Sequence, residues 1–144
     1  MNRSPASHKD VPTTVEQLLA AARAQLTRLS ADQAYAAMRD GAQLIDIRSD
    51  SQRATDGIIP GAYFVARNVL EWRLDSACPH RDPHLVRPDA PLVLICDEGY
   101  QSSLAAATVQ QFGRTGVTDV IGGFRAWRAA GLPIQPYAEK GSVA

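Results

Sequence analysis

The chain has 144 residues, of which 45% are hydrophobic and 21% are charged, so it is long enough for one globular domain with a core and too short to argue for two. Its 15 basic and 15 acidic residues cancel, which gives no reason to expect nucleic acid or a membrane surface as a partner. No apolar run approaches the roughly 18 residues that span a bilayer, and the polar N-terminus lacks the apolar core of a signal peptide. We therefore expect a cytoplasmic protein.

The N-terminal part is predicted to form two helices. Residues 13–29 carry apolar side chains at helical spacing, and Thr13 with Glu16 fits a capping box at their start. Ser30 and Gln33 repeat the capping pattern and open the second helix. We expect the first, amphipathic helix to pack on the flank of the domain, or on a second subunit in a homodimer, through Leu18, Leu19, Leu26 and Leu29.

Beyond Gly41 the hydrophobic period changes, and apolar runs typical of buried strands alternate with helical segments. Strands are predicted at residues 42–48, 91–96 and 117–123 and within 57–65, and helices at 68–74, 102–113 and 124–131. Residues 75–91 hold four prolines and few apolar side chains, which indicates a surface loop. The alternation predicts an α/β domain around a parallel sheet at residues 30–137, between flexible tails at 1–12 and 138–144.

The two cysteines, Cys78 and Cys96, are too few for a secreted disulfide scaffold and suit a reducing compartment in which a thiol is free to react. Cys96 ends a predicted buried strand, and in open parallel sheets ligands bind beyond the carboxyl ends of the strands. A cysteine in this place can also simply fill space, because free cysteine is among the most buried residue types. The choice between a reactive thiol and a cysteine that fills the core therefore depends on the residues that follow Cys96.

The loop at residues 97–101 favours a reactive thiol. It can curl so that successive backbone N–H groups face inward, with Gly99 allowing a tight bend and Ser102 or Ser103 capping the helix that follows. Backbone amides and the helix dipole together stabilise negative charge, on a thiolate, a persulfide or a bound oxyanion. We therefore expect an anion cradle around the sulfur of Cys96.

Four motifs, taken in chain order, carry a resemblance to a known family that covers about Leu29 to Ile134. They are LIDIR in the first predicted strand, the turn DGIIPGA, the loop CDEGYQSS and the C-terminal stretch GGFRAWRAAGLP. With this ordered set the chain resembles the single-domain rhodaneses, which are sulfurtransferases. The resemblance implies a doubly wound parallel sheet flanked by helices on both faces, to which the N-terminal helix is an addition.

The resemblance also implies a mechanism. Cys96 would take a sulfane sulfur from a small donor, become a persulfide, and pass the outer sulfur to a thiol or another nucleophilic acceptor, which could belong to a protein. It implies no metal and no organic cofactor. The loop residues that line the site, mainly with backbone N–H groups, would be Asp97, Glu98, Gly99, Tyr100, Gln101 and Ser102.

The charge of this loop departs from the family pattern. Asp97 and Glu98 make it acidic, and Gln101 stands where an arginine is common. Thiosulfate carries two negative charges, so four unit repulsions would cost about 3 kcal/mol at about 6 Å in bulk water, and about 1 kcal/mol once salt screens them. We therefore expect poor use of thiosulfate. Arg67 and Arg73 are candidates to border the pocket and offset the acidic loop.

Three other interpretations are open. A cysteine phosphatase on a related fold needs a longer loop closed by an arginine clamp, but Ser102 occupies that position and Ile95 precedes the cysteine. A sulfur-relay or regulatory binding module of slight activity is a second alternative. Cys78, His80 and His84 suit zinc by type, yet their irregular spacing favours solvated loop residues.

Four further residues have structural interpretations. Trp72 and Trp127 are expected to be core or half-buried anchors. Asp46 and Arg48 are expected to tie the end of the first predicted strand to nearby loops.

Overall fold

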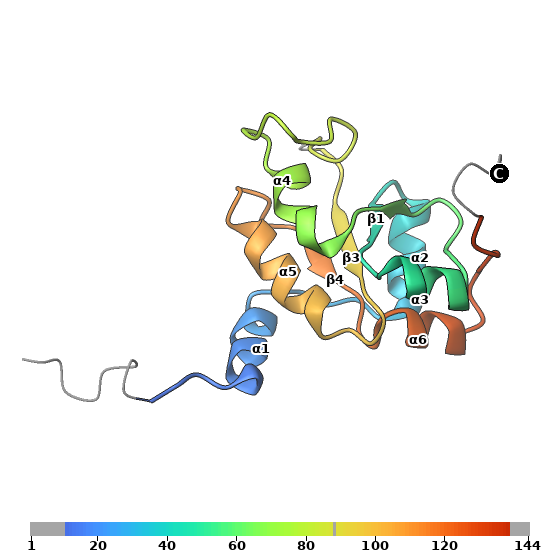
Figure 1. Ribbon diagram of the computed structural model, residues 1–144, viewed down its shortest axis with the longest axis horizontal. Helices are drawn as coiled ribbons and strands as arrows, with labels where there is room; N and C mark the ends of the chain where they lie inside the picture. Colours follow the sequence, from blue (N-terminus) through green and yellow to red (C-terminus); the bar gives the residue numbers. More distant parts are fainter. Residues whose placement is uncertain (1–10, 88, 139–144) are drawn as a thin grey trace, which may run out of the picture.

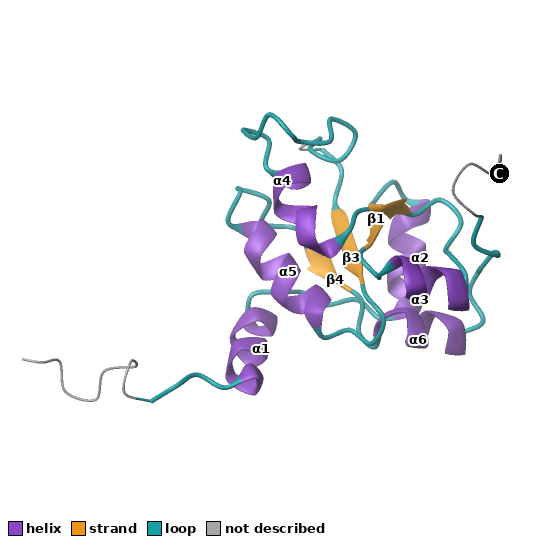
Figure 2. Ribbon diagram, viewed as in Figure 1, coloured by secondary structure: helices purple, strands orange, loops and turns teal. Residues whose placement is uncertain are grey.

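The computed structural model describes residues 11–87 and 89–138, so the expected tails at 1–12 and 138–144 lie almost wholly outside the described residues. A four-stranded parallel sheet has helices on both faces (Figures 1 and 2), as predicted, and the N-terminal helix is present. The strands are β1 (Gln43–Asp46), β2 (Tyr63–Phe64), β3 (Leu92–Ile95) and β4 (Thr118–Asp119). The helices are α1 (Val15–Ala24), α2 (Ala31–Arg39), α3 (Asp50–Asp56), α4 (Leu70–Leu74, after a 3-10 turn at Arg67–Val69), α5 (Gln101–Gln110) and α6 (Gly123–Ala129).

The strands lie in the order β2-β1-β3-β4. Ile45 of β1 pairs with Leu94 of β3, and Leu94 in turn pairs with Asp119 of β4. Both β1 and β3 are buried along their whole length, because helices cover both faces of a parallel sheet, and this is why the two segments are nearly continuous apolar runs. The topology therefore places the end of β3, and with it Cys96, between two neighbouring strands.

Two buried clusters, one on each face of the sheet, fix the helices. Neighbouring residues of a strand point to opposite faces, so Leu44 and Ile45 belong to different clusters. On one face α4 and α5 contribute Leu70, Leu74, Ala105, Ala106 and Val109. On the other, α2 and α6 contribute Ala31, Ala34, Phe124 and Trp127. The helix α1 packs on α5 at the edge of the first group (Figure 1).

The start and end of α1 differ from the prediction. The capping box is formed by Thr14 and Gln17 rather than by Thr13 and Glu16, because both neighbouring pairs fit the pattern and only packing chooses between them. The helix ends at Ala24, and the chain then runs beside β4, where Leu29 forms a parallel bridge with Val120. Of the leucines expected to pack, Leu19 is buried, Leu26 and Leu29 are partly buried, and Leu18 is exposed.

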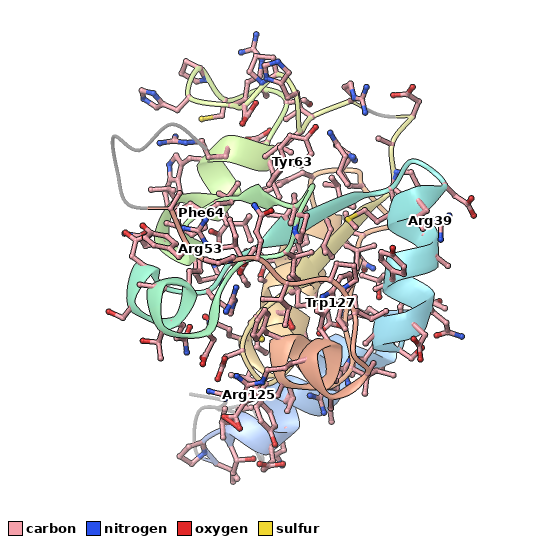
Figure 3. All side chains as sticks on the ribbon, turned by 90° about the vertical axis from the view of Figure 1, so that its right-hand side faces the viewer. Arg39, Arg53, Tyr63, Phe64, Arg125 and Trp127 are labelled. Carbon is pink, nitrogen blue, oxygen red and sulfur yellow. The ribbon has the colours of Figure 1, made fainter. Side chains whose placement is uncertain are left out.

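One helix and one side chain did not follow from the sequence. The helix α3 buries none of its residues, so it lacks the hydrophobic period that marks a helix, and its only signal is the Ser49–Gln52 capping box. Trp72 is 54% exposed, because α4 turns Leu70 and Leu74 inward and Trp72 away. Trp127 is fully buried and meets Tyr35 edge to face, extending from α6 toward α2 (Figure 3).

Candidate active site

Cys96 follows β3 directly and is buried, with 2% of its surface exposed. It lies in a pocket of about 220 Å³ whose other lining residues are Gln52, Asp97, Glu98, Tyr100 and Gln101. A second pocket of about 460 Å³ shares Gln52 and Gln101 with the first and continues to Arg67 and Asn68. The sulfur therefore lies beside a polar surface that is larger than the pocket immediately around it.

Within the described residues, two hydrogen bonds involve the sulfur. The Gly99 N–H donates to Cys96 Sγ at 3.1 Å, and the Cys96 thiol donates to the Ser102 hydroxyl at 3.2 Å. Gly99 has a φ of +86°, and a Cβ there would lie 2.8 Å from the backbone nitrogen of Gly122. Only glycine accepts this backbone conformation in such close packing, and the turn aims its amide back at the sulfur.

The two serines do not cap α5 as expected. The N-cap position is Tyr100, which makes no side-chain capping bond, and Ser102 and Ser103 lie in the first turn. Both hydroxyls donate instead to Asp119 Oδ2, at 2.7 and 2.8 Å. A buried carboxylate needs hydrogen-bond donors, and the serines satisfy that need because α5 begins one residue earlier than the sequence suggested.

Asp119 at the end of β4 connects the sulfur to the N-terminal segment. It is fully buried, and Arg28 binds it through two nitrogens, Nε to Oδ1 at 2.9 Å and Nη2 to Oδ2 at 3.1 Å. Two-point binding by arginine together with the serine hydroxyls satisfies the buried charge. Sequence reasoning missed both residues; a charged residue inside the apolar run at 117–123 was the signal for Asp119.

Two arginines donate hydrogen bonds to the backbone of the active-site loop. Arg23 Nη2 and Arg28 Nη2 both donate to the carbonyl oxygen of Gly99, at 2.8 and 3.0 Å. Arg23 also donates from Nε to the Ser103 hydroxyl at 3.1 Å and lies over the Tyr100 ring. We refer to Arg23 and Arg28 as the arginine pair. The sequence offered no signal for it, because the contacts join residues far apart in the chain.

The two loop carboxylates differ in their surroundings. Asp97 is partly buried and faces Arg125 of α6, whose Nε lies 3.3 Å from Asp97 Oδ2; Figure 3 shows Arg125 on that helix. Arg125 also lies 3.5 Å from Asp56. Glu98 is exposed, and no ion pair joins it to another residue of the described ranges. The acidity expected of the loop thus rests mainly on Glu98.

The remaining candidates lie at different distances from the sulfur. Arg67 lines the second pocket and is paired with Glu71 at 2.9 Å. Arg73 lines neither pocket and donates to the His80 carbonyl. Both cysteines are free thiols. Within residues 11–87 and 89–138, no group of three or more His, Cys, Asp or Glu residues has the arrangement of a metal site.

Asp46 and Arg48 form the tie predicted at the end of β1. Arg48 Nη2 donates to Asp46 Oδ2 at 2.8 Å and to the Gly57 carbonyl at 2.8 Å. The guanidinium lies over the Phe124 ring at 3.7 Å.

Comparisons with known proteins identify the family. The rhodanese-like domain family matches residues 30–130. The thiosulfate sulfurtransferase GlpE of Pseudomonas aeruginosa strain LESB58 is 34% identical over 102 residues, which cover 71% of this chain and 84% of the relative. The corresponding protein of Pseudomonas entomophila is 32% identical over 112 residues, 73% of this chain and 87% of its own. The chain belongs to the rhodanese-like family.

Solved structures agree on the fold. A Rhodopseudomonas palustris protein of unknown function, described as a possible tyrosine phosphatase, has 31% identity and a TM-score of 0.80 and covers 94% of this chain and 99% of its own. A thiosulfate sulfurtransferase from Pseudomonas aeruginosa has 27% identity and a TM-score of 0.61, covering 76% of this chain and 19% of its own. The alignment with the Rhodopseudomonas palustris protein covers 94% of this chain, whereas the family match begins only at residue 30. That alignment must therefore include part of the N-terminal segment. As far as the chain is described, its helices are too short or too polar to cross a membrane.

Proposed function

We propose that this sulfurtransferase of the rhodanese-like family carries a sulfane sulfur as a persulfide on Cys96. The Cys96 thiolate attacks the outer sulfur of a donor R–S–SH, the sulfur–sulfur bond of the donor breaks, and the thiolate R–S⁻ leaves with the bonding electrons. An acceptor thiolate then attacks the outer sulfur of the Cys96 persulfide and restores the Cys96 thiolate. No electron source, metal or organic cofactor is needed, because each step exchanges one sulfur bond for another.

One observation carries the proposal: a sulfur at the end of a central strand accepts the Gly99 amide at 3.1 Å and borders a pocket. A cysteine that only filled the core would need neither the amide nor the pocket. The same amide can stabilise the charge that moves on and off the sulfur during transfer. Tyr100 and Gln101, which also line the pocket, would contact the donor.

The proposal includes weak use of thiosulfate, although the curated relatives carry thiosulfate sulfurtransferase as their name. Because Arg125 offsets Asp97, the main repulsion is that between Glu98 and the two charges of thiosulfate. At about 6 Å it amounts to about 1.4 kcal/mol in bulk water and less in salt, half of the cost expected from the sequence. We infer a several-fold handicap for thiosulfate and a preference for a less negative donor, such as a cysteine-derived persulfide.

The second pocket supports a donor or acceptor larger than thiosulfate. Its lining includes the hydrogen-bonding side chains of Asn68, Gln52 and Gln101, and its charged residues Arg48, Asp50 and Arg67 carry both signs. A small thiol or the cysteine-bearing segment of a partner protein would lie there.

We place the reaction in the cytoplasm, because a chain with only two cysteines suits a reducing compartment. A homodimer through α1 would have to use the exposed Val15 and Leu18, since Leu19 is buried within the chain.

A transfer assay tests the proposal. The protein is supplied with a cysteine-derived persulfide, thiosulfate or an aryl phosphate, and the first two reactions include a thiol acceptor. We expect transfer from the persulfide, slower transfer from thiosulfate and no phosphate release, because no arginine closes the loop around a phosphate. Phosphate release without sulfur transfer would refute the proposal in favour of the phosphatase, and failure of all three substrates would favour a binding module.

A further inference from the structure

The segment that precedes the family domain reaches the active-site loop. The family match begins at residue 30, yet Arg23 at the end of α1 and Arg28 after it both bind the Gly99 carbonyl. We propose that the arginine pair positions the Gly99 amide for sulfur transfer on Cys96. This inference rests on the proposed function and assigns part of the site to residues outside the family domain.

Gly99 is held from both sides. Its N–H donates to Cys96 Sγ, and its carbonyl accepts from two guanidinium groups, so one residue separates the sulfur from two cations. Glycine has the widest choice of backbone conformations and no side chain that could restrain it. The N–H and the carbonyl belong to consecutive peptide units joined at the Gly99 Cα, so the arginine pair holds the second unit and thereby limits how far the first unit, which carries the N–H, can turn.

The arginine pair is itself held in place. Arg28 binds Asp119 at two points, and Asp119 accepts from Ser102, whose hydroxyl also contacts the sulfur. Arg23 is fixed by the Ser103 hydroxyl. These hydrogen bonds form a ring that begins and ends at the sulfur, and the N-terminal segment supplies its arginines. A lysine could not make the several planar bonds that each arginine makes here.

These bonds do more than attach α1 to the domain. The buried Leu19 and Ala22 already pack α1 on the rest of the chain, and that packing does not require donors aimed at a loop carbonyl. A donor that must face developing negative charge is sensitive to orientation, and removal of one such donor in other enzymes slows the chemical step by about 100-fold to 1000-fold. Loosening the Gly99 amide rather than removing it should have a smaller effect.

The test uses the full chain with Arg23→Met and Arg23→Lys, because these changes leave the Arg28–Asp119 pair intact. Arg39→Met is the matched control, since Arg39 also lies over a tyrosine ring but on α2. We measure single-turnover persulfide formation with a cysteine-derived persulfide, alkylation of Cys96 as a function of pH, and the melting temperature. A second pair, Arg28→Met alone and combined with Asp119→Asn, separates loss of the loop contact from the burial of an unpaired charge.

We expect Arg23→Met to slow persulfide formation by about tenfold and to move the alkylation profile to higher pH, because the thiolate loses a well-aimed amide. Arg23→Lys should recover little of the rate, Arg39→Met should match the unchanged protein, and the Arg28 double variant should fold and still be slow. A folded Arg23→Met protein with unchanged rate and alkylation profile would overturn the inference. Failure of the unchanged protein to form any persulfide would refute the proposed function instead, and the alkylation profile would still test the positioning of Cys96.

Discussion

Arg48 and Arg28 make nearly the same hydrogen bonds at the ends of two different strands. Arg48 binds Asp46 of β1 and donates to the Gly57 carbonyl at 2.8 Å. Arg28 binds Asp119 of β4 and donates to the Gly99 carbonyl at 3.0 Å. Both aspartates are buried, and both glycines have positive φ angles, +90° and +86°.

The difference lies in what each glycine does with its N–H group. The Gly57 amide bonds to the Arg53 carbonyl and closes α3, whereas the Gly99 amide bonds to Cys96 Sγ. The same ion-pair chemistry therefore stabilises a turn in one place and orients a donor toward the sulfur in the other. Variants of the two regions should be alike in stability and unlike in activity.

The largest effect is expected at the sulfur itself. Cys96→Ser should abolish sulfur transfer, because a hydroxyl cannot carry a sulfane sulfur. The loss of stability should be small, because serine and cysteine have similar volumes. Cys78→Ser is the control and should keep most of the activity, since Cys78 lies outside the pocket around Cys96. The assay is transfer from a cysteine-derived persulfide to a thiol. Loss of activity in the Cys78 variant alone would show that the site is assigned to the wrong cysteine.

Breaking either buried pair should cost a similar amount of stability. Arg48→Met leaves Asp46 with only the more distant Arg53 as an arginine partner, whose Nε lies 3.8 Å away. Arg28→Met leaves Asp119 with only its two serine donors. Loss of one partner of a buried ion pair typically lowers the free energy of unfolding by about 3–5 kcal/mol. Urea unfolding measures the loss. Among the molecules that remain folded, Arg28→Met should slow sulfur transfer by more than Arg48→Met, although Arg48 lines the second pocket. Equal slowing in both variants would mean that the two regions do not differ as described.

The glycines give a smaller version of the same contrast. A Cβ on Gly57 would lie 2.8 Å from the Gln135 carbonyl oxygen, and one on Gly99 would lie 2.8 Å from the Gly122 nitrogen. Gly57→Ala and Gly99→Ala should each lose about 1–3 kcal/mol through strain at a positive φ, measured by thermal unfolding. Only Gly99→Ala should also slow persulfide formation. A Gly99→Ala protein as active as Gly57→Ala would remove the amide from the mechanism.

The smallest expected effect concerns charge rather than geometry. Glu98→Gln should raise kcat/KM for thiosulfate several-fold, and Arg125→Gln should lower it by exposing the charge of Asp97, since each unit repulsion is worth about 0.7 kcal/mol at about 6 Å in water. Both effects should shrink as salt is added. If kcat/KM for thiosulfate is unchanged by both substitutions and by the salt concentration, neither carboxylate repels thiosulfate in the pocket.

Most of the fold could be predicted because its central elements carry local signals. The buried strands β1 and β3 are apolar runs, and α2 opens with the predicted Ser30–Gln33 capping box. The helix α3 escaped prediction because it buries no side chain. The end of α1 escaped it as well, because the bridge between Leu29 and Val120 depends on a strand far along the chain.

The site could be predicted only in its local part. Cys96 and the bend at Gly99 follow from a cysteine and a glycine placed after a buried strand. The cations that surround them do not, because Arg23 and Arg28 reach Gly99 across 76 and 71 residues and Arg125 reaches Asp97 across 28. Ser102 was predicted to lie in the loop, but its partner Asp119 depends on the packing of α5 against β4.

The most direct test of the central claim is the intact mass of the protein after brief incubation with a cysteine-derived persulfide, followed by peptide mapping. We predict the added mass of one sulfur atom on the peptide that contains Cys96, its loss when a thiol acceptor is added, and no such addition in Cys96→Ser. A protein that transfers sulfur while Cys96 never gains that mass, or that carries the sulfur on Cys78, would contradict the account.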